Sequence, residues 1–417
     1  MLKRLFLAVL ALTFMVSPVA AQQSIRDLQI GTNEVPPALP FEFGIEDWTP
    51  YTVDAPSLLE ATSQRTDMEM ITAGDNVGAF RFICMPGQVR AEDPLVAPGK
   101  RGGSHPHQFY GNTAADRNST VASLGSSGDS TCQNILNRSA YWQITVQNPA
   151  GKVVRFDYVS IYYKRPPASR PECTPGNIKY MGRCVGTPNN IRYIFGYDMI
   201  TNTTPSGGKS WQCVRNNNGA GPFTNIVDAA AACPGLPGNP ATDITHLGVS
   251  ITAPFCWNGI ALDSANHRSH VSDALVDADT GRAACPKTHP YVIPTFTATA
   301  FFRVDATLNT SGVWDPATSC SVHWHLSSDC MPGMPVYKPG TTAHMDYWER
   351  WHLATKKKWT DNCINRGLSC TAGDLGNGER MKQVWPLTYD ANNPGSRIVN
   401  RPKMAKESSR FIIRATQ

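Results

Sequence analysis

Histidine is the residue type whose distribution in this chain points to chemistry. Imidazole binds metal ions and transfers protons near neutral pH. Two of the histidine pairs have the form His-x-His, and on an extended backbone residues two apart project to the same face. Each such pair can therefore present two imidazoles to one ion or one substrate. Eight of the ten histidines are grouped in this way or stand in short motifs: His105 with His107, His267 with His270, His323 with His325, and His289 and His344 singly.

Glycines flank the first of these pairs. Gly102 and Gly103 precede His105, and Gly111 follows His107. Because glycine lacks a Cβ, the backbone on both sides can approach a ligand closely. The alternative is a pair of loop histidines that are satisfied by backbone carbonyl groups and bind nothing.

The pair His267 and His270 has a different spacing. Residues three apart lie on one face of a turn or a helix, and Arg268 adds a fixed positive charge between them. Guanidinium and imidazole groups together suit the binding of a carboxylate or a sulfate. A purely structural turn that is capped by Asp263 is the competing interpretation.

Longer motifs around these histidines resemble a known family. The stretch Ser104 to Asn112 reads SHPHQFYGN and is similar to the HxHxFFGN element of DUF1996, a secreted domain family of unknown function. The five elements that carry the resemblance span about residues 76 to 370. Four of them follow in the family's order: Ser130 to Cys132 with Ser139 to Trp142 (TC…SAYW), Cys256 to His270 (CWDG…LDS..HRSH), Cys285 to Pro294 (CPxTHP…P), and Gly340 to Trp351 (G…HADFxxGW).

The chain departs from the family pattern at several positions. The family commonly has an acid where this chain has Gln108 and Asn266, and Met345 replaces a small residue. A general-base role for those acids does not carry over to this chain. Asp263 and Asp346 are kept.

The resemblance implies a secreted domain that is often joined to carbohydrate-binding modules in relatives, so a polysaccharide or cell-wall glycan is the expected partner. The leading hypothesis is an enzyme, a glycoside hydrolase or a polysaccharide lyase, whose motif residues converge on one His-rich cleft. A hydrolase needs two carboxylates, and a lyase needs a base and charge neutralisation. The predicted catalytic residues are His105, His107, His267, His270, His344 and Asp346. The predicted substrate contacts are Arg268, Tyr110, Asn112, Trp142, Asp263, His289 and Trp348, with Tyr110 also a candidate acid or base.

The second hypothesis is an extracellular metal-binding or glycan-binding protein without turnover. Its predicted ligands are His105, His107, His344 and Asp346. Three nitrogens and one carboxylate suit zinc or copper, and calcium is a further candidate divalent metal. The two hypotheses overlap, because an enzyme could itself use the metal.

Strand patterns dominate the segments that must position these residues. Apolar and polar residues alternate in Ile191 to Met199, Val153 to Tyr163, Leu247 to Ile251 and Thr295 to Asp305. Such alternation is typical of half-buried antiparallel strands. Only one helix is expected, from Thr342 to about Lys358, because this segment lacks Gly and Pro and ends in three lysines. We therefore predict a mainly β fold, a large antiparallel β-sandwich-like domain with long disulfide-stapled loops and few helices.

The cysteines predict disulfides. All twelve lie after residue 21, and no CxxC pair is present to suggest a zinc-cysteine cluster. Six disulfides are therefore expected. Short loops make three local bridges plausible, namely Cys173 with Cys184, Cys320 with Cys330, and Cys363 with Cys370.

The N-terminus predicts export. Lys3 and Arg4 precede an apolar run that is too short to span a bilayer, and small residues follow it, so cleavage is expected after Ala21. The expected organisation is a signal peptide at 1–21, an extension packing on the main body at 22–75, and the DUF1996-like domain at 76–417. A secreted or periplasmic location without a membrane span follows. Removing Lys3 and Arg4 from 38 basic residues leaves 36 against 33 acidic ones, a charge of +3, which argues against nucleic acid as a partner.

Overall fold

The protein is described here by a computed structural model that covers residues 25–39, 51–62, 77–203, 208–216, 218–239, 241–384 and 397–405. The predicted signal peptide, residues 1–21, lies outside the described residues. Strand makes up 31% of the structure and helix 12%, which confirms the predicted mainly β class. None of the described helices has the length and apolar character needed to cross a bilayer.

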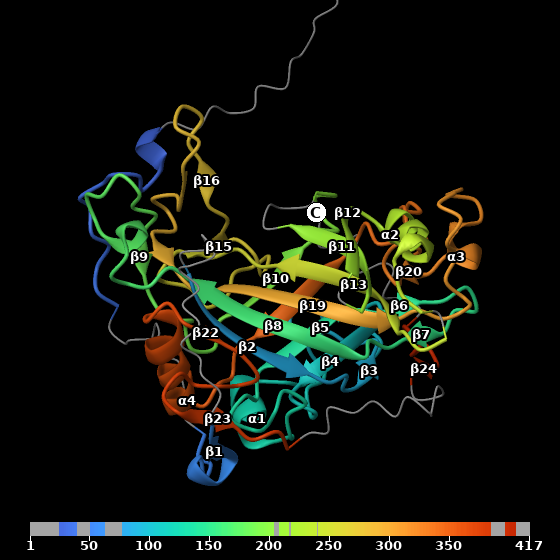
Figure 1. Ribbon diagram of the computed structural model, residues 1–417, viewed down its shortest axis with the longest axis horizontal. Coiled ribbons are helices and arrows are strands. Elements are labelled where there is room, and N and C mark those ends of the chain that lie inside the picture. Colours follow the sequence, from blue (N-terminus) through green and yellow to red (C-terminus); the bar gives the residue numbers. More distant parts are fainter. Residues whose placement is uncertain are drawn as a thin grey trace, which may run out of the picture.

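Two sheets packed face to face form the body of the molecule, and in Figure 1 the strands β2, β8, β19 and β13 lie side by side. The larger sheet is antiparallel apart from the parallel pairing of β2 with β22. Its order is β12 (Asn218–Phe223), β11 (Lys209–Arg215), β13 (Thr245–Thr252), β19 (Thr295–Arg303), β8 (Tyr158–Arg165), β2 (Gly78–Cys84) and β22 (Ser369–Cys370). The smaller sheet has the order β10 (Arg192–Gly196), β21 (His344–Trp348), β5 (Ala140–Ile144), β4 (His107–Gly111) and β3 (Val89–Arg90).

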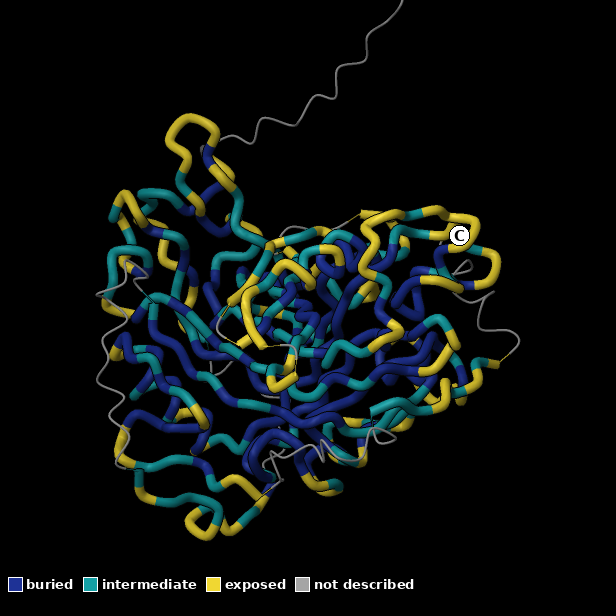
Figure 2. The backbone as a smooth tube through the Cα atoms, turned by 45° about the vertical axis from the view of Figure 1, so that its right-hand side comes forward, coloured by how far each residue is buried: buried dark blue, intermediate teal, exposed yellow. Residues whose placement is uncertain are grey.

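Aromatic side chains fill the space between the two sheets. Phe296 of β19 stacks on Tyr141 of β5 and on Tyr347 of β21, with ring centroids 5.6 and 4.9 Å apart. Figure 2 shows the central strands in the colour of buried residues, whereas exposed residues gather in the loops. Because side chains alternate along a strand, each sheet also has an outer face that points away from this core.

Short elements surround the sandwich. The small sheets pair β1 (Leu59–Ala61) with β23 (Glu379–Met381), and β16 (Leu275–Val276) with β17 (Ala283–Ala284). Two others have the orders β15 (Val271–Ser272), β14 (Cys256–Trp257), β18 (Tyr291–Val292), β9 (Arg183–Cys184), and β20 (His325–Leu326), β6 (Val146–Gln147), β7 (Val153–Val154), β24 (Ile398–Val399). The α-helices among the described residues are α1 (Val121–Ser126), α2 (Ile226–Ala232), α3 (Ser319–Val322) and α4 (Leu353–Trp359).

The segment predicted as a helix from Thr342 to Lys358 is a strand in its first half. β21 occupies His344–Trp348, and helix begins only at Leu353. All five residues of β21 are buried, because the strand is covered on both faces, so it lacks the alternation that marks a half-buried strand. The strand predicted at Val153 to Tyr163 is divided into β7 and β8.

Six disulfides staple the loops, as predicted, and the three local bridges are among them. The other three join elements that are farther apart in sequence: Cys84 with Cys132, Cys213 with Cys233, and Cys256 with Cys285. These bridges fit an oxidising compartment.

Parts of the expected N-terminal extension contact the body. β1 pairs with β23, and Leu28 forms a bridge with Pro286. The Tyr51 hydroxyl donates to the carbonyl oxygen of Leu136 at 3.1 Å. The division into an extension and a main domain stays a prediction.

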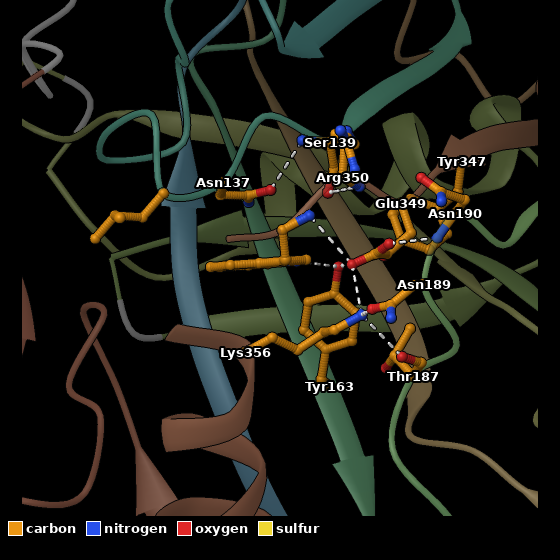
Figure 3. A network of polar contacts seen from close by, with 12 residues as sticks. Asn137, Ser139, Tyr163, Thr187, Asn189, Asn190, Tyr347, Glu349, Arg350 and Lys356 are labelled. Atoms are coloured by element: carbon orange, nitrogen blue, oxygen red, sulfur yellow. Dashed lines mark hydrogen bonds and ion pairs between the residues drawn. The ribbon is translucent and has the colours of Figure 1, made fainter. Parts of the chain in front are cut away.

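A buried ion pair fixes α4 to the end of β21 (Figure 3). The Lys356 Nζ lies 2.8 Å from Oε1 of Glu349, and both side chains are 0% exposed. Lys356 also donates to the Thr187 carbonyl oxygen and the Asn189 side chain, and Glu349 accepts a hydrogen bond from the Asn190 backbone. These contacts satisfy both charges within the protein, so we interpret the pair as structural.

Candidate functional site

The outer face of the five-stranded sheet carries the candidate site. β5 lies between β4 and β21, and Trp142 of β5 is opposite both Phe109 of β4 and Asp346 of β21. His107 and His344 lie two residues from Phe109 and Asp346 along their strands. Side chains two apart share a face, so the strand register places His107, His344 and Asp346 together on this outer face.

Three histidines meet there. His105 lies just before β4, and its ring centroid is 4.4 Å from that of His107 and 5.1 Å from that of His344. Each of the three residues offers a ring nitrogen within 4.8 Å of the others. Asp93, His107 and Asp346 form a second group of ligand atoms by the same criterion. The two groups share His107, so they make one cluster, which we call the histidine cluster.

Backbone contacts orient two of the imidazoles. The Nδ1 atom of His107 lies 3.1 Å from the carbonyl oxygen of Glu92, and Nδ1 of His344 lies 3.0 Å from that of Thr342. A carbonyl oxygen can only accept, so Nδ1 carries the proton in each ring and Nε2 keeps its lone pair. Metal-binding histidines are commonly held in this way.

Several polar atoms of the cluster are buried without a hydrogen-bond partner. They are both ring nitrogens of His105, Nε2 of His107 and both carboxylate oxygens of Asp346. Buried polar atoms are normally paired, and leaving one unpaired costs about 1–3 kcal/mol. These atoms come from three residues gathered in one place, and such a group could hold a metal ion.

Asp93 is a cluster member that the sequence motifs did not identify. Its Oδ1 accepts hydrogen bonds from the backbone N–H groups of Leu95 and Val96, at 2.8 and 2.9 Å. These contacts fix the carboxylate beside His107. Asp93 precedes a proline in a loop and belongs to no histidine motif, so only the fold brings it to the cluster.

Burial keeps the histidines neutral. It lowers the pKa of His105 and His344 well below the usual value, and the neighbouring imidazole of His107 lowers both further. The pKa of His107 is also lowered by burial. Burial raises the pKa of the Asp346 carboxyl, and the charge of Asp93 adds to this effect. Neutral imidazoles are the form that binds metal ions.

The members of the cluster are almost completely buried. His105 and His344 are 6% exposed, Asp346 1% and His107 0%. A separate buried cluster on this face contains Leu95, Phe109, Leu124, Trp142, Ile194 and Trp348. Of the predicted substrate contacts, Trp142 is therefore a buried residue that stacks on Phe109 at 5.5 Å. Arg192 lies over the ring of Trp348, 5.0 Å from its centroid.

Tyr110 and Asn112 lie apart from the cluster. Tyr110 is three residues from His107 on β4 and points into the core, where its hydroxyl contacts Sδ of Met345 at 3.1 Å. The Asn112 amide donates to the carbonyl oxygens of Leu124 and Ser127 and so holds the C-terminal end of α1. The contacts of Asn112 have an evident structural role.

The second histidine motif forms a separate group. Asp263 accepts hydrogen bonds from His267 and Arg192, each at 2.8 Å. Nδ1 of His270 contacts the Ser264 hydroxyl at 2.9 Å, and Nε2 of His289 lies 3.0 Å from the Ser269 carbonyl oxygen. These residues hold one another in a turn.

Arg268 links this turn to the histidine cluster. Its guanidinium donates to the carbonyl oxygens of Gly196 and Tyr197 at 3.3 and 3.0 Å, and Gly196 pairs with His344 across the two strands. The Arg268 charge also lowers the pKa of His344 and opposes the increase in the pKa of Asp346. Arg268 thus acts on the cluster electrostatically.

Comparison with curated proteins and with solved structures finds no similar chain. The model of one protein family, described as "Domain of unknown function (DUF1996)", matches residues 93–351. The match begins at Asp93 and contains every member of the histidine cluster. It also confirms the resemblance that the sequence motifs indicated. The chain belongs to the DUF1996 family.

Proposed function

We propose that this domain is an exported metalloprotein in which His105, His107 and His344 bind one transition-metal ion, with Asp346 as the carboxylate ligand. The observation that carries the proposal is the set of buried, unpartnered nitrogen and oxygen atoms that gather in the histidine cluster. A bound cation would satisfy these atoms at once. It would also offset the cost of burying the carboxylate of Asp346.

The donor set favours zinc or copper. Imidazole suits both metals, and three imidazoles with one carboxylate match the usual coordination of zinc. Calcium takes about six to eight oxygen ligands, whereas the cluster offers the carboxylates of Asp93 and Asp346 only. Of the candidate metals, calcium is therefore the least supported.

The buried position of the cluster favours a closed site. A catalytic metal keeps one position open for water or substrate, whereas a structural metal is enclosed by protein. No cluster member is more than 6% exposed. The other predicted catalytic residues, His267 and His270, lie in the separate turn. Cleavage of a polysaccharide by a hydrolase or lyase mechanism stays a prediction. It is tested by incubating metal-loaded protein with neutral and acidic polysaccharides and assaying reducing ends and unsaturated uronates.

Metal content tests the proposal directly. Protein stripped with a chelator, incubated with zinc or copper and desalted should retain one ion per chain, as measured by mass spectrometry of the metal. His107→Ala and His344→Ala should lose this ion, because each removes a ligand. His289→Ala is the matched control, because its ring contacts Thr288 and Ser269 in the separate turn. Wild-type protein that retains neither metal would refute the proposal, and so would equal retention by all three variants.

A further inference from the structure

The outer face of the seven-stranded sheet contains a hollow. Its volume is about 450 Å³, within the range of about 300–1,000 Å³ that is usual for ligand pockets. Among the described elements, no helix crosses the strands that form it (Figure 1). The residues that line it include Arg81, Tyr158, Ser160, Tyr162, Thr299 and Phe301.

The strand register arranges these residues in rows. Tyr158 of β8 is opposite Phe301 of β19, and their rings stack with centroids 4.8 Å apart. Ser160 is opposite Thr299, so two hydroxyl groups form the next row. Tyr162 follows on β8, about 13 Å from Tyr158 at the usual rise per strand residue. The hollow thus has an aromatic residue toward each end and hydroxyl groups between them.

Basic groups accompany the second aromatic residue. The guanidinium carbon of Arg81 lies 5.2 Å from the ring centroid of Tyr162, and Nζ of Lys164 lies 5.0 Å from it. Arg303 continues the same outer face on β19. The three strands β2, β8 and β19 contain no Asp or Glu. Asp157, which directly precedes β8, is paired with His246 and Arg397. The charged side chain that lines the hollow is that of Arg81, with Lys164 beside it, so the charge nearest to Tyr162 is positive and complements a negatively charged ligand.

We propose that this hollow binds a chain of an acidic polysaccharide, a polyuronate. The flat rings of Tyr158, Phe301 and Tyr162 would pack against the apolar faces of the sugars. Arg81 and Lys164 would face their carboxylates, and Ser160 and Thr299 would exchange hydrogen bonds with sugar hydroxyl groups. The binding is independent of the metal, because the hollow and the histidine cluster lie on opposite outer faces of the sandwich.

Isothermal titration with polygalacturonate tests this inference, with uncharged dextran as the reference ligand. The wild-type protein should bind polygalacturonate with an affinity that falls as salt is added, and should not bind dextran. Tyr158→Ala and Arg81→Gln should each weaken binding about tenfold, which corresponds to one lost stacking contact or one lost charge contact. Arg81→Lys should retain part of the affinity because it keeps the charge.

Control variants distinguish binding in the hollow from a general effect of protein charge and from binding at the histidine cluster. Arg282→Gln removes an equal charge beside β17, outside the hollow, and should bind like the wild type. His107→Ala should also bind normally, so that loss of the metal and loss of the glycan are distinguishable. Thermal unfolding verifies that each variant is folded. Equal binding of dextran, unchanged binding by folded Tyr158→Ala and Arg81→Gln, or preferential binding of DNA over polygalacturonate would overturn the proposal.

Discussion

Asp346 is the residue of the histidine cluster whose burial is hardest to explain without a cation. It is 1% exposed, and neither carboxylate oxygen has a hydrogen-bond partner. Burying such a group unpaired costs about 1–3 kcal/mol or more. We predict that Asp346→Asn raises the unfolding temperature of the metal-free protein, because the variant buries a neutral group. The same variant should show a smaller increase in unfolding temperature on addition of zinc or copper, because it has lost a ligand.

Circular dichroism melts with chelator and with metal measure both effects. Asp263→Asn is the matched control, since Asp263 is paired with Arg192 and His267. It should lower the unfolding temperature in both conditions. A metal-free Asp346→Asn protein that unfolds at a lower temperature than wild type would contradict the prediction.

The members of the site differ in how far the sequence could identify them. The His-x-His spacing predicts that His105 and His107 act together, and His344 and Asp346 have the same spacing. In the structure only His107 of the first pair lies on a strand, and His105 directly precedes it. The alternation rule also explains the position of Tyr110, which is three residues from His107 and so faces the core. Asp93 could not be found, because no local pattern connects a loop aspartate to strands that pair far along the chain.

A buried ion pair, in addition to apolar contacts, holds helix α4 in place. Lys356 and Glu349 are both fully buried, and removing one partner of a buried pair leaves the other uncompensated, at a cost of about 3–5 kcal/mol. We therefore predict that Lys356→Met lowers the free energy of unfolding by about this amount, measured by urea denaturation.

The neighbouring lysine provides a control on the same helix. Lys357 pairs with Asp361 at 2.9 Å, but these side chains are 50% and 41% exposed. Exposed ion pairs contribute about 0–1 kcal/mol, so Lys357→Met should have little effect. If the two substitutions lowered the free energy of unfolding equally, burial would not be what makes the Lys356–Glu349 ion pair important for stability.

Strand β21 shows why the sequence pattern predicts some strands correctly and mistakes another for a helix. β8 and β19 alternate cleanly because one face meets the core and the other faces solvent, and both were predicted. β21 is a central strand with both faces covered. Its Met345 and Trp348, with the following Trp351, are spaced like the residues on one face of a helix. Coverage of the second face is a tertiary property, so no local pattern could have distinguished this strand from a helix.

At the scale of the whole molecule, the sequence pattern predicts the class but not the arrangement. The alternating strand segments and the twelve cysteines predict a disulfide-rich, mainly β protein, and that class is confirmed. The short disulfide loops indicated three pairings in advance, whereas the bridge between Cys84 and Cys132 depends on distant strand order. The same strand order decides that the histidine cluster and the hollow lie on different outer faces. The two regions can therefore be altered separately.

Buried histidines also determine how the whole molecule responds to acid. Burial lowers the pKa of His270 from 6.5 to about 4. Above pH 6.5 this residue is neutral in both the folded and the unfolded chain, so it contributes nothing to the pH dependence. As the pH falls from 6.5 toward 4, the unfolded chain takes up a proton that the folded protein resists, and stability is lost. The loss from His270 reaches about 3 kcal/mol, and the lowered pKa values of His323 and His325 act in the same direction.

We therefore predict that chelator-treated protein becomes steadily less stable between pH 6.5 and 4, measured by urea unfolding at a series of pH values. His270→Gln should reduce this decline, because glutamine takes up no proton in either state. His289→Gln should leave the decline unchanged, because its partly exposed ring lies at the surface of the same turn. If stability declined equally in wild type and His270→Gln, protonation of His270 would not favour the unfolded chain. That result would contradict the claim that burial lowers the pKa of His270.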